Sequence, residues 1–402
     1  MSRSSRLAPR MGTVGASPTA AISDTVRALA ADGITVDNLG EGELDFDTPA
    51  PIAEAGINAI RAGLTKYTAV AGTTGLKDAI RAHFRRQNGL DYAASEVIAA
   101  CGAKQIIFNA FLATLDAGDE VIVPTPCWVS YPDMIRLAGG VPVLVPCLPE
   151  NGWKLSAHDL ARAITPRTRW IILNSPNNPT GAVYSAAELG ALCDVLAAHD
   201  DILIMADDIY EAIVYDAAFA TPAALRPDLA SRILTINGVS KSFSMTGWRL
   251  GYAGGPAWLI AALDTLQSQS TSNPSSISQD AARVALEGGT DFLDTWMPIL
   301  RKRRDMVMAM IRQTPGLDAT LPEGAFYVFA DIRGCLNRTT PSGRVLHTDV
   351  DFATYLLEAA RVAVVPGSAF RTPGYVRIAY GVSTQVLSAC CARMQAACTA
   401  LR

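Results

Sequence analysis

Short apolar runs rich in β-branched residues recur through the middle of the chain. They are EVIVP (120–124), VPVLVP (141–146), RWIILN (169–174), DILIMAD (201–207), RILTIN (232–237) and RLGYAGG (249–255). Between them lie segments with apolar residues at helical spacing, such as 185–200 and 103–119, the latter with a stop signal at Gly118. Short continuous strands that alternate with helices indicate an α/β fold with a mostly parallel sheet covered by helices on both faces.

The pattern changes from about residue 291 onward. A long helical segment at 294–313 leads into GAFYVFADI (324–332), and the short runs VAVVPG (362–367) and YVRIAY (375–380) follow among further helical patterns. Strands and helices are mixed here in a hairpin-like order. This order predicts a second, smaller α+β domain.

The composition is that of an ordinary globular protein. The chain has 402 residues, 50% hydrophobic and 18% charged, with a formal net charge of −4. This length allows a large core and two domains. The slightly acidic balance gives no electrostatic footprint for nucleic acid or an anionic membrane, and no apolar run is long enough to cross a bilayer. We therefore expect a cytoplasmic protein without nucleic-acid or membrane partners.

The ends and the cysteines add little further chemistry. The opening MSRSSRLAPR contains three arginines with no apolar segment after them, so it is not a secretory signal. A disordered leader is expected, and a fragment of an organellar transit sequence is the alternative. The eight cysteines are scattered, and the adjacent pair Cys390 and Cys391 suits neither a metal site nor a disulfide. The four histidines show no i+4 pairing. Reduced, buried thiols and no metal site are expected.

Chemically useful residues follow four of the predicted strands. Ligands of open α/β sheets bind beyond the carboxyl ends of the strands. The residues found there are Trp128, Asn178, Asp207 with Tyr210 three positions later, and Lys241. Taken singly, each has an ordinary explanation as a core, turn, helix-capping or surface residue.

Lys241 lies in the stretch NGVSKSFSMTGWRLGY (237–252), among small hydroxyl and apolar residues. A solvated surface lysine usually has charged neighbours, but here the nearest downstream charge is Arg249. An amine in such a setting is partly desolvated, which lowers its pKa and makes it a better nucleophile towards a carbonyl. An ordinary loop lysine is the alternative on this stretch alone.

Together, the strand-end residues are complementary to a flat, aromatic, aldehyde-bearing phosphate ester. The ring needs a stacking face, its nitrogen a buried carboxylate, its phenolic oxygen hydrogen-bond donors and its aldehyde an amine. Gly102, Ala103 and Lys104 lie at a strand-to-helix turn, where free N–H groups favour an anion. Ser240 and Arg249 could add a hydroxyl and a fixed positive charge.

Ordered motifs along nearly the whole chain after Ser17 carry a family resemblance. They include LGEGELDFDTP (39–49), TKYTAVAGTTGLKDAI (65–80), GAKQ (102–105), NSPNNPTGAVYS (174–185), ADDIYE (206–211), TSNPSSISQDAA (271–282), PEGAFYVF (322–329) and YVRIAY (375–380). The chain resembles the pyridoxal-phosphate aminotransferases of fold type I (class I/II), in the bacterial branch of the aspartate aminotransferase family.

The resemblance implies a fold, a cofactor and a homodimer with shared active sites. It divides the chain into a disordered or arm-like leader (1–16), an N-terminal arm with part of the small domain (17–48), a large pyridoxal-phosphate-binding domain (49–290) and a small domain (291–402). Lys241 would be the Schiff-base lysine, and Asp207 would pair with the pyridine nitrogen. Tyr67 would reach the cofactor phosphate of the neighbouring subunit.

The remaining roles follow from the same resemblance. Tyr210 and Asn178 would bond the ring oxygen, and Trp128 would stack on the ring. The phosphate would be held by Gly102, Ala103, Lys104, Ser240 and Arg249. Arg377 would clamp the substrate α-carboxylate as a bidentate partner, and the further substrate-binding residues would be Gly42, Asn178 and Trp128.

Several positions depart from the family pattern. Leu44 replaces a common Pro, Cys127 replaces the Tyr common before Trp128, and Gly238 stands where many relatives carry a phosphate-binding Ser. RIAYG takes the place of RLSYA. No catalytic group is removed, but Cys127 and Leu44 leave the shape of the substrate pocket open.

The substrate side chain is the least determined feature. Animal-type relatives hold a distal carboxylate with an Arg five residues before the Asn of the SNP motif, and here Ser268 occupies that position. Bacterial relatives with GAKQ use the Lys of that motif, here Lys104. A mobile ammonium favours a dicarboxylate while tolerating other side chains. A lysine that merely balances the cofactor phosphate is the alternative.

The expected activity is transamination between an L-amino acid and a 2-oxo acid with ping-pong kinetics, with aspartate, glutamate, 2-oxoglutarate or oxaloacetate as one partner. Lys241 would carry the proton from Cα. Another reaction on the same cofactor, such as elimination, decarboxylation or cyclisation, remains an alternative, although Arg377 argues against loss of the carboxylate. A non-catalytic cofactor-binding regulator is a third, disfavoured because no DNA-binding segment is added.

Overall fold

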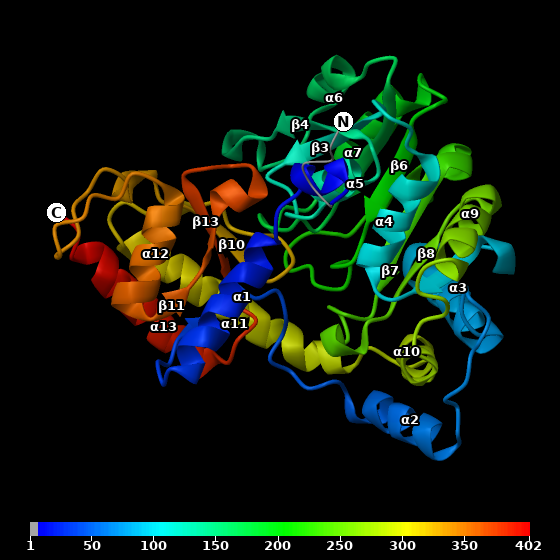
Figure 1. The fold of residues 1–402 in the computed structure, drawn as a ribbon, viewed down its shortest axis with the longest axis horizontal. Helices are drawn as coiled ribbons and strands as arrows, with labels where there is room; N and C mark the ends of the chain where they lie inside the picture. The colour runs from blue at the N-terminus through cyan, green and yellow to red at the C-terminus, as the bar shows by residue number, and fades with distance from the viewer. Residues whose placement is uncertain (1–6) are drawn as a thin grey trace.

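The larger part of the chain is built on a seven-stranded sheet, in a computed structural model that describes residues 7–402 (Figure 1). In spatial order its strands are β2 (Val97–Ala100), β8 (Gly251–Gly254), β7 (Ile233–Gly238), β6 (Leu203–Asp207), β5 (Thr168–Asn174), β3 (Glu120–Thr125) and β4 (Val141–Pro146). The strands from β7 to β4 run parallel, and β8 is antiparallel to both of its neighbours. The expected mostly parallel sheet is confirmed.

Side chains alternate along β5 between the two faces of this sheet, and helices bury both faces. Ile171 and Leu173 lie in one hydrophobic cluster, and Trp170 and Ile172 lie in another. The first cluster includes residues of α2 (Ala50–Arg61), α3 (Thr74–Asn88), α6 (Ala157–Ala163), α7 (Ala186–Ala197), α8 (Pro222–Leu225) and α10 (Ser276–Glu287), and the second includes residues of α4 (Ala103–Thr114), α5 (Tyr131–Leu137) and α9 (Ala257–Ser268). Continuous apolar runs in the sequence therefore correspond to strands buried on both sides.

A four-stranded antiparallel sheet forms the centre of the smaller part, which lies beside the large sheet (Figure 1). Its order is β12 (Val365–Pro366), β13 (Tyr375–Ala379), β10 (Tyr327–Asp331) and β9 (Asp318–Ala319). The helices of this part are α1 (Pro18–Ala31), α11 (Phe292–Gln313), α12 (Asp349–Ala360) and α13 (Thr384–Thr399). A parallel pair, β1 (Asp37–Asn38) with β11 (Val362–Ala363), ties the N-terminal segment to it.

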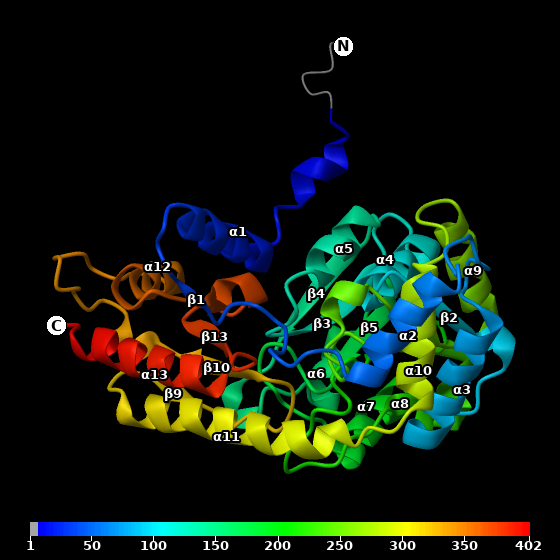
Figure 2. The same cartoon turned by 90° about the horizontal axis from the view of Figure 1, so that it is seen from below.

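Helix α11 links the two parts. Figure 2 shows it running along the small part toward the helices of the large sheet. Short 3₁₀ segments complete the described chain at Pro9–Thr13, Ala94–Glu96, Pro149–Asn151, Pro227–Arg232, Thr246–Trp248, Arg333–Cys335 and Gly367–Phe370. Within residues 7–402, no helix combines the length and the apolar character needed to cross a bilayer.

Two expectations about segment ends need comment. The helix expected to stop at Gly118 ends at Thr114, because Leu115 already has an extended backbone and its side chain is buried. Residues 1–6 of the expected leader (1–16) lie outside the described residues, and Pro9–Thr13 is a short 3₁₀ helix. The domain boundaries placed at residues 49 and 291 stay predictions.

Candidate active site

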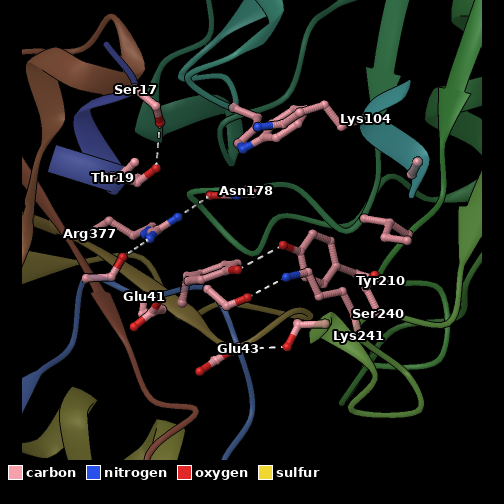
Figure 3. A pocket seen from close by; sticks show the side chains of 18 of the residues that line it. Ser17, Thr19, Glu41, Glu43, Lys104, Asn178, Tyr210, Ser240, Lys241 and Arg377 are labelled. Carbon is pink, nitrogen blue, oxygen red and sulfur yellow. Dashed lines mark hydrogen bonds between the residues drawn. The ribbon is translucent and has the colours of Figure 1, made fainter. Parts of the chain in front are cut away.

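A cavity of about 470 Å³ lies at the carboxyl ends of the parallel strands, where the large sheet, the small part and α1 meet. Figure 3 shows side chains from these three regions pointing toward one another. Eleven of the thirteen residues expected at the site line it: Gly42, Ala103, Lys104, Trp128, Asn178, Asp207, Tyr210, Ser240, Lys241, Arg249 and Arg377. The chain thus gathers residues from segments up to several hundred positions apart.

Lys241 lies in the turn after β7 and extends into this cavity. Its Nζ donates a hydrogen bond to the Gly42 carbonyl oxygen (Figure 3). Burial lowers the pKa of the Lys241 amine to about 8, with a smaller contribution from the Arg377 charge, while Glu43 opposes the shift. An amine with this pKa is half neutral at about pH 8, well below the pH at which an ordinary lysine reaches that point, and the neutral form is the one that attacks a carbonyl.

Asp207 ends β6 and offers one oxygen to the cavity. Its Oδ2 accepts a hydrogen bond from the Tyr131 hydroxyl, whereas Oδ1 is buried and has no hydrogen-bond partner among the described residues. Burial raises the pKa of the Asp207 carboxyl to about 6, and the Tyr131 hydrogen bond moderates this shift. The next residue, Asp208, does not line the cavity, so Asp207 is the one of these two adjacent carboxylates that adjoins it.

Arg377, on β13, is the buried cation of the cavity's opposite wall. Its Nη1 donates to Oδ1 of Asn178 at 3.0 Å and its Nη2 to the Gly40 carbonyl oxygen at 2.5 Å, while Nε is buried and has no partner in the part of the chain that the structure describes. The guanidinium carbon lies 4.5 Å from the ring centre of Tyr327 and 5.1 Å from that of Phe370. A guanidinium fixed in this way can receive a carboxylate with both arms of its fork.

Tyr210 and Trp128 supply the aromatic walls. The Tyr210 hydroxyl is 2.8 Å from the Tyr327 hydroxyl, and burial raises the pKa of Tyr210 well above its ordinary value. The Trp128 ring lies 4.9 Å below Nζ of Lys104, within cation–π distance. Both phenol and indole are therefore held by neighbours rather than free to rotate.

The turn before α4 forms a cradle suited to an anion. Helix α4 begins at Ala103, after Gly102 with a φ of 89° that favours glycine. A Cβ on Gly102 would lie 2.5 Å from Nη2 of Arg249, so glycine also makes room for that guanidinium. Ser240 and Lys104 line the same region, and burial followed by the Arg249 charge lowers the pKa of Lys104. Free N–H groups at a helix start beside an arginine favour a phosphate.

Tyr67 lies outside the cavity of its own chain. Its side chain is 91% exposed, in the segment between α2 and α3. Gly102 is the other expected residue that does not line the cavity, although it adjoins Arg249.

Several cavity residues are not among those expected from the sequence. Tyr131, Tyr327, Ser17, Thr19, Glu41 and Glu43 line it. Tyr131 follows Trp128 by three positions and is the first residue of α5, and this closeness to Trp128 in the sequence was a signal that could have found it. Tyr327 lies inside the apolar run of β10 and carries no polar signal. Ser17 precedes α1 and Thr19 lies in its first turn, and α1 is placed at the cavity by its packing on the small part.

The chain is similar to known proteins over nearly its whole length. The family model described as aminotransferase class I and II matches residues 34–394. An aspartate aminotransferase of Rhizobium meliloti is 51% identical over 98% of this chain and 96% of its own, and an aspartate/prephenate aminotransferase of Cereibacter sphaeroides is 52% identical over 98% and 99%.

Solved structures give the same result. The crystal structure of the aspartate aminotransferase from Rhizobium meliloti covers 99% of this chain and 100% of its own with a TM-score of 0.95 at 50% identity. The aspartate aminotransferase from Thermus thermophilus with maleate covers 98% and 100%, with a TM-score of 0.91 at 40% identity. The chain therefore belongs to the aminotransferase class I and II family and is an aminotransferase of fold type I.

Proposed function

We propose that this enzyme transfers the amino group of aspartate or glutamate to a 2-oxo acid, with pyridoxal 5'-phosphate as its cofactor. The observation that carries the proposal is the meeting of three groups in one cavity. They are the Lys241 amine, the unpartnered Oδ1 of Asp207 and the Arg377 guanidinium. In this reaction the amine would react with the cofactor aldehyde, the carboxylate oxygen would bind the pyridine nitrogen, and the guanidinium would bind the substrate carboxylate.

The donor set of the cavity fits pyridoxal phosphate. A buried carboxylate oxygen without a protein partner is costly unless a ligand group supplies one, and a protonated ring nitrogen would do so at Asp207. Gly102, Ala103, Ser240 and Arg249 would hold the phosphate at the start of α4. Trp128 would stack on the ring, and Tyr210 with Asn178 would bond its phenolic oxygen.

When bound, this cofactor supplies an aldehyde carbon for imine exchange and a ring that accepts an electron pair. The chain's own residues do the rest. Arg377 binds the substrate α-carboxylate and so fixes the orientation of Cα, assisted by Asn178 and Gly42. Lys241, once its amine is free, would accept the Cα proton and donate it again at the carbon that had been the aldehyde carbon, and its lowered pKa of about 8 raises the fraction of the neutral, basic form above that of an ordinary lysine.

The names of the relatives support a dicarboxylic substrate. Those from Rhizobium meliloti and Thermus thermophilus are called aspartate aminotransferases. Lys104 is the cation that lines the cavity near Trp128, and it would attract a second carboxylate. The Cereibacter sphaeroides relative is named for prephenate as well, which makes prephenate a second acceptor to assay.

We also propose a homodimer in which Tyr67 enters the partner's site. Tyr67 is 91% exposed, and Ile57 and Ile60 of α2 and Leu64 just after it are apolar side chains exposed by 40–56%. Exposed apolar groups clustered on one face indicate a surface that a partner covers.

The test is spectroscopic and follows the two halves of the reaction. Protein purified with pyridoxal phosphate should absorb near the visible edge, lose this band on adding aspartate, and regain it on adding 2-oxoglutarate. A matched series with alanine, phenylalanine, oxaloacetate, pyruvate and prephenate would rank the substrates. Absence of any band that responds to amino acid would refute the proposal.

A further inference from the structure

The segment 39–48, called the arm here, runs between the two main cations of the cavity. The Gly40 carbonyl accepts from Nη2 of Arg377 at 2.5 Å, and the Gly42 carbonyl accepts from Nζ of Lys241. A Cβ on Gly42 would lie 2.7 Å from the Tyr327 hydroxyl, so the arm passes there with no room to spare. The position of the arm therefore sets where the Lys241 amine can rest.

One ion pair holds the arm to the long helix of the small part. Arg303, on α11, donates through Nη1 and Nη2 to the two oxygens of Asp45 at 2.6 and 2.9 Å. Arg303 is only 3% exposed, and its Nε donates to Oγ1 of Thr384 at 3.2 Å. A two-pronged contact from a buried arginine fixes both the distance and the orientation of the carboxylate.

The ring of Phe46 reinforces this attachment. The Arg303 guanidinium lies 5.1 Å from its centre, and Phe46 stacks on Trp296 of α11 at 4.5 Å with an interplanar angle of 9°. The Asp45 amide also donates to the Gly381 carbonyl at 2.7 Å, directly after β13. Asp45 thus lies at the point where the arm is fixed to the small part from two sides.

The other end of the arm is bonded to the loop that carries Lys241. Thr48 Oγ1 donates to the Ser244 carbonyl at 3.0 Å, the Ser244 hydroxyl donates to the Phe46 carbonyl, and Thr246 Oγ1 donates to Glu43 at 2.9 Å. The arm therefore joins α11 to the Lys241 loop through a continuous set of hydrogen bonds.

We propose that Asp45, gripped by Arg303, is a positioning residue that keeps the Gly42 carbonyl where the Lys241 amine rests whenever that amine is not joined to the cofactor. The inference rests on the proposed function, because only in that chemistry does Lys241 alternate between a bound and a free amine. Asp45 acts through the arm and touches neither cofactor nor substrate.

The direction in which the pKa of Lys241 shifts distinguishes a displaced arm from a purely electrostatic effect of the substituted residue. A carbonyl acceptor stabilises the ammonium form, so losing it lowers the pKa of Lys241 below its value of about 8. Asp45→Asn loosens the arm and removes a negative charge, and both effects lower that pKa. Arg303→Gln loosens the arm but removes a positive charge. Charge alone would raise the pKa of Lys241 in Arg303→Gln, whereas a displaced arm lowers it.

The measurement uses cofactor-free protein. Lys241 is methylated with isotopic formaldehyde and a hydride donor from about pH 6 to about pH 10, and the labelled peptide is quantified by mass spectrometry. We expect the labelling midpoint to fall by about half a unit in both Asp45→Asn and Arg303→Gln. Asp47→Asn is the matched control, since Asp47 lies in the same arm and forms no ion pair within residues 7–402. Its midpoint should stay close to the wild-type value.

Arg303→Lys covers the case in which Arg303→Gln does not fold. It keeps the charge and loses the fork, so charge alone predicts no shift and a displaced arm predicts a lower midpoint. In the cofactor-loaded enzyme, Asp45→Asn should reduce kcat about tenfold with a larger primary isotope effect for Cα-deuterated aspartate. A raised midpoint in Arg303→Gln, an unshifted one in Arg303→Lys, or an equal shift in Asp47→Asn would overturn the inference. Failure of wild-type enzyme to transaminate would instead overturn the proposed function.

Discussion

The Tyr131 hydroxyl donates a hydrogen bond to Oδ2 of Asp207, and Oδ1 of that buried carboxylate has no hydrogen-bond partner within residues 7–402. Tyr131 lies on α5 and is itself fully enclosed, with its ring edge-on to Trp128 at 5.3 Å between centres. The contact stabilises the charged carboxylate in a setting where burial opposes charge. Under the proposed function, Tyr131 would therefore help to keep Asp207 charged, so that it could hold a ring nitrogen in its protonated form.

Tyr131→Phe should weaken this function without changing the fold. Removing a donor from a buried carboxylate costs about 1.5–3 kcal/mol. We expect the pKa of Asp207 to rise above about 6 in the cofactor-free protein and kcat to fall at least tenfold, with weaker retention of cofactor on dialysis. Tyr355→Phe is the control, because its hydroxyl donates to a carbonyl in the small part at 2.9 Å. Equal kinetic losses in both variants would contradict a specific role for Tyr131.

The pH dependence of cofactor capture should report the pKa of Lys241. Burial lowers this pKa to about 8, and only the neutral amine attacks an aldehyde. The rate at which cofactor-free protein takes up pyridoxal phosphate should therefore rise with pH and level off above about 8. Stopped-flow absorbance would follow it, and Lys241→Ala should show no covalent uptake and no transamination while keeping its fold. A rate that is flat from pH 6 to pH 9 would count against the lowered pKa.

Much of the large domain could be predicted from the sequence because strands buried on both faces appear as continuous apolar runs. The runs at 169–174 and 201–207 are apolar on both faces, and the polar residue that ends each of them faces the cavity. Lys241 could also be recognised from its immediate neighbours, because it is a cation among apolar and hydroxyl residues. These features are local in sequence, so a pattern can carry them.

The contacts that close the site are not local. Tyr131 meets Asp207 across 76 positions, Lys241 meets Gly42 across 199, and Arg303 meets Asp45 across 258. No periodicity encodes such pairs, since they depend on how α5, the arm and α11 pack. The end of α4 at Thr114 was missed for a related reason, because burial of Leu115 outweighs the stop signal at Gly118.

Arg377→Lys should impair substrate binding more than turnover. An ammonium cannot reproduce the two-pronged fork, and it would also leave the Asn178 and Gly40 oxygens with fewer donors. We expect KM for aspartate to rise at least tenfold, which corresponds to about 1.4 kcal/mol of lost binding. Steady-state kinetics would measure this, with the exposed Arg333→Lys as the matched control. An unchanged KM would show that the carboxylate binds elsewhere.

Subunit mixing tests the placement of Tyr67. Lys241→Ala should be inactive, and Tyr67→Phe should reduce kcat about tenfold by removing one phosphate contact. If Tyr67 serves the partner's site, a mixed dimer of the two variants contains one site with both wild-type groups, and activity returns. If Tyr67 serves its own chain, no site is restored. Sedimentation of the wild type as a fully active monomer would also exclude the shared site.

Lys104→Ala distinguishes the two roles open to this lysine. Its Nζ lies 4.9 Å from the Trp128 ring centre at the cavity wall, and burial with the Arg249 charge lowers its pKa. A point charge that attracts a distal carboxylate favours acidic substrates over uncharged ones. The methyl side chain of alanine in Lys104→Ala carries no charge and cannot provide that attraction. We expect kcat/KM to fall at least tenfold for aspartate and 2-oxoglutarate and much less for alanine and phenylalanine. The exposed Lys302→Ala on α11 is the control. An equal fall for both classes, with weaker cofactor retention, would assign Lys104 to the phosphate, and the dicarboxylate preference would then rest on other residues of the cavity.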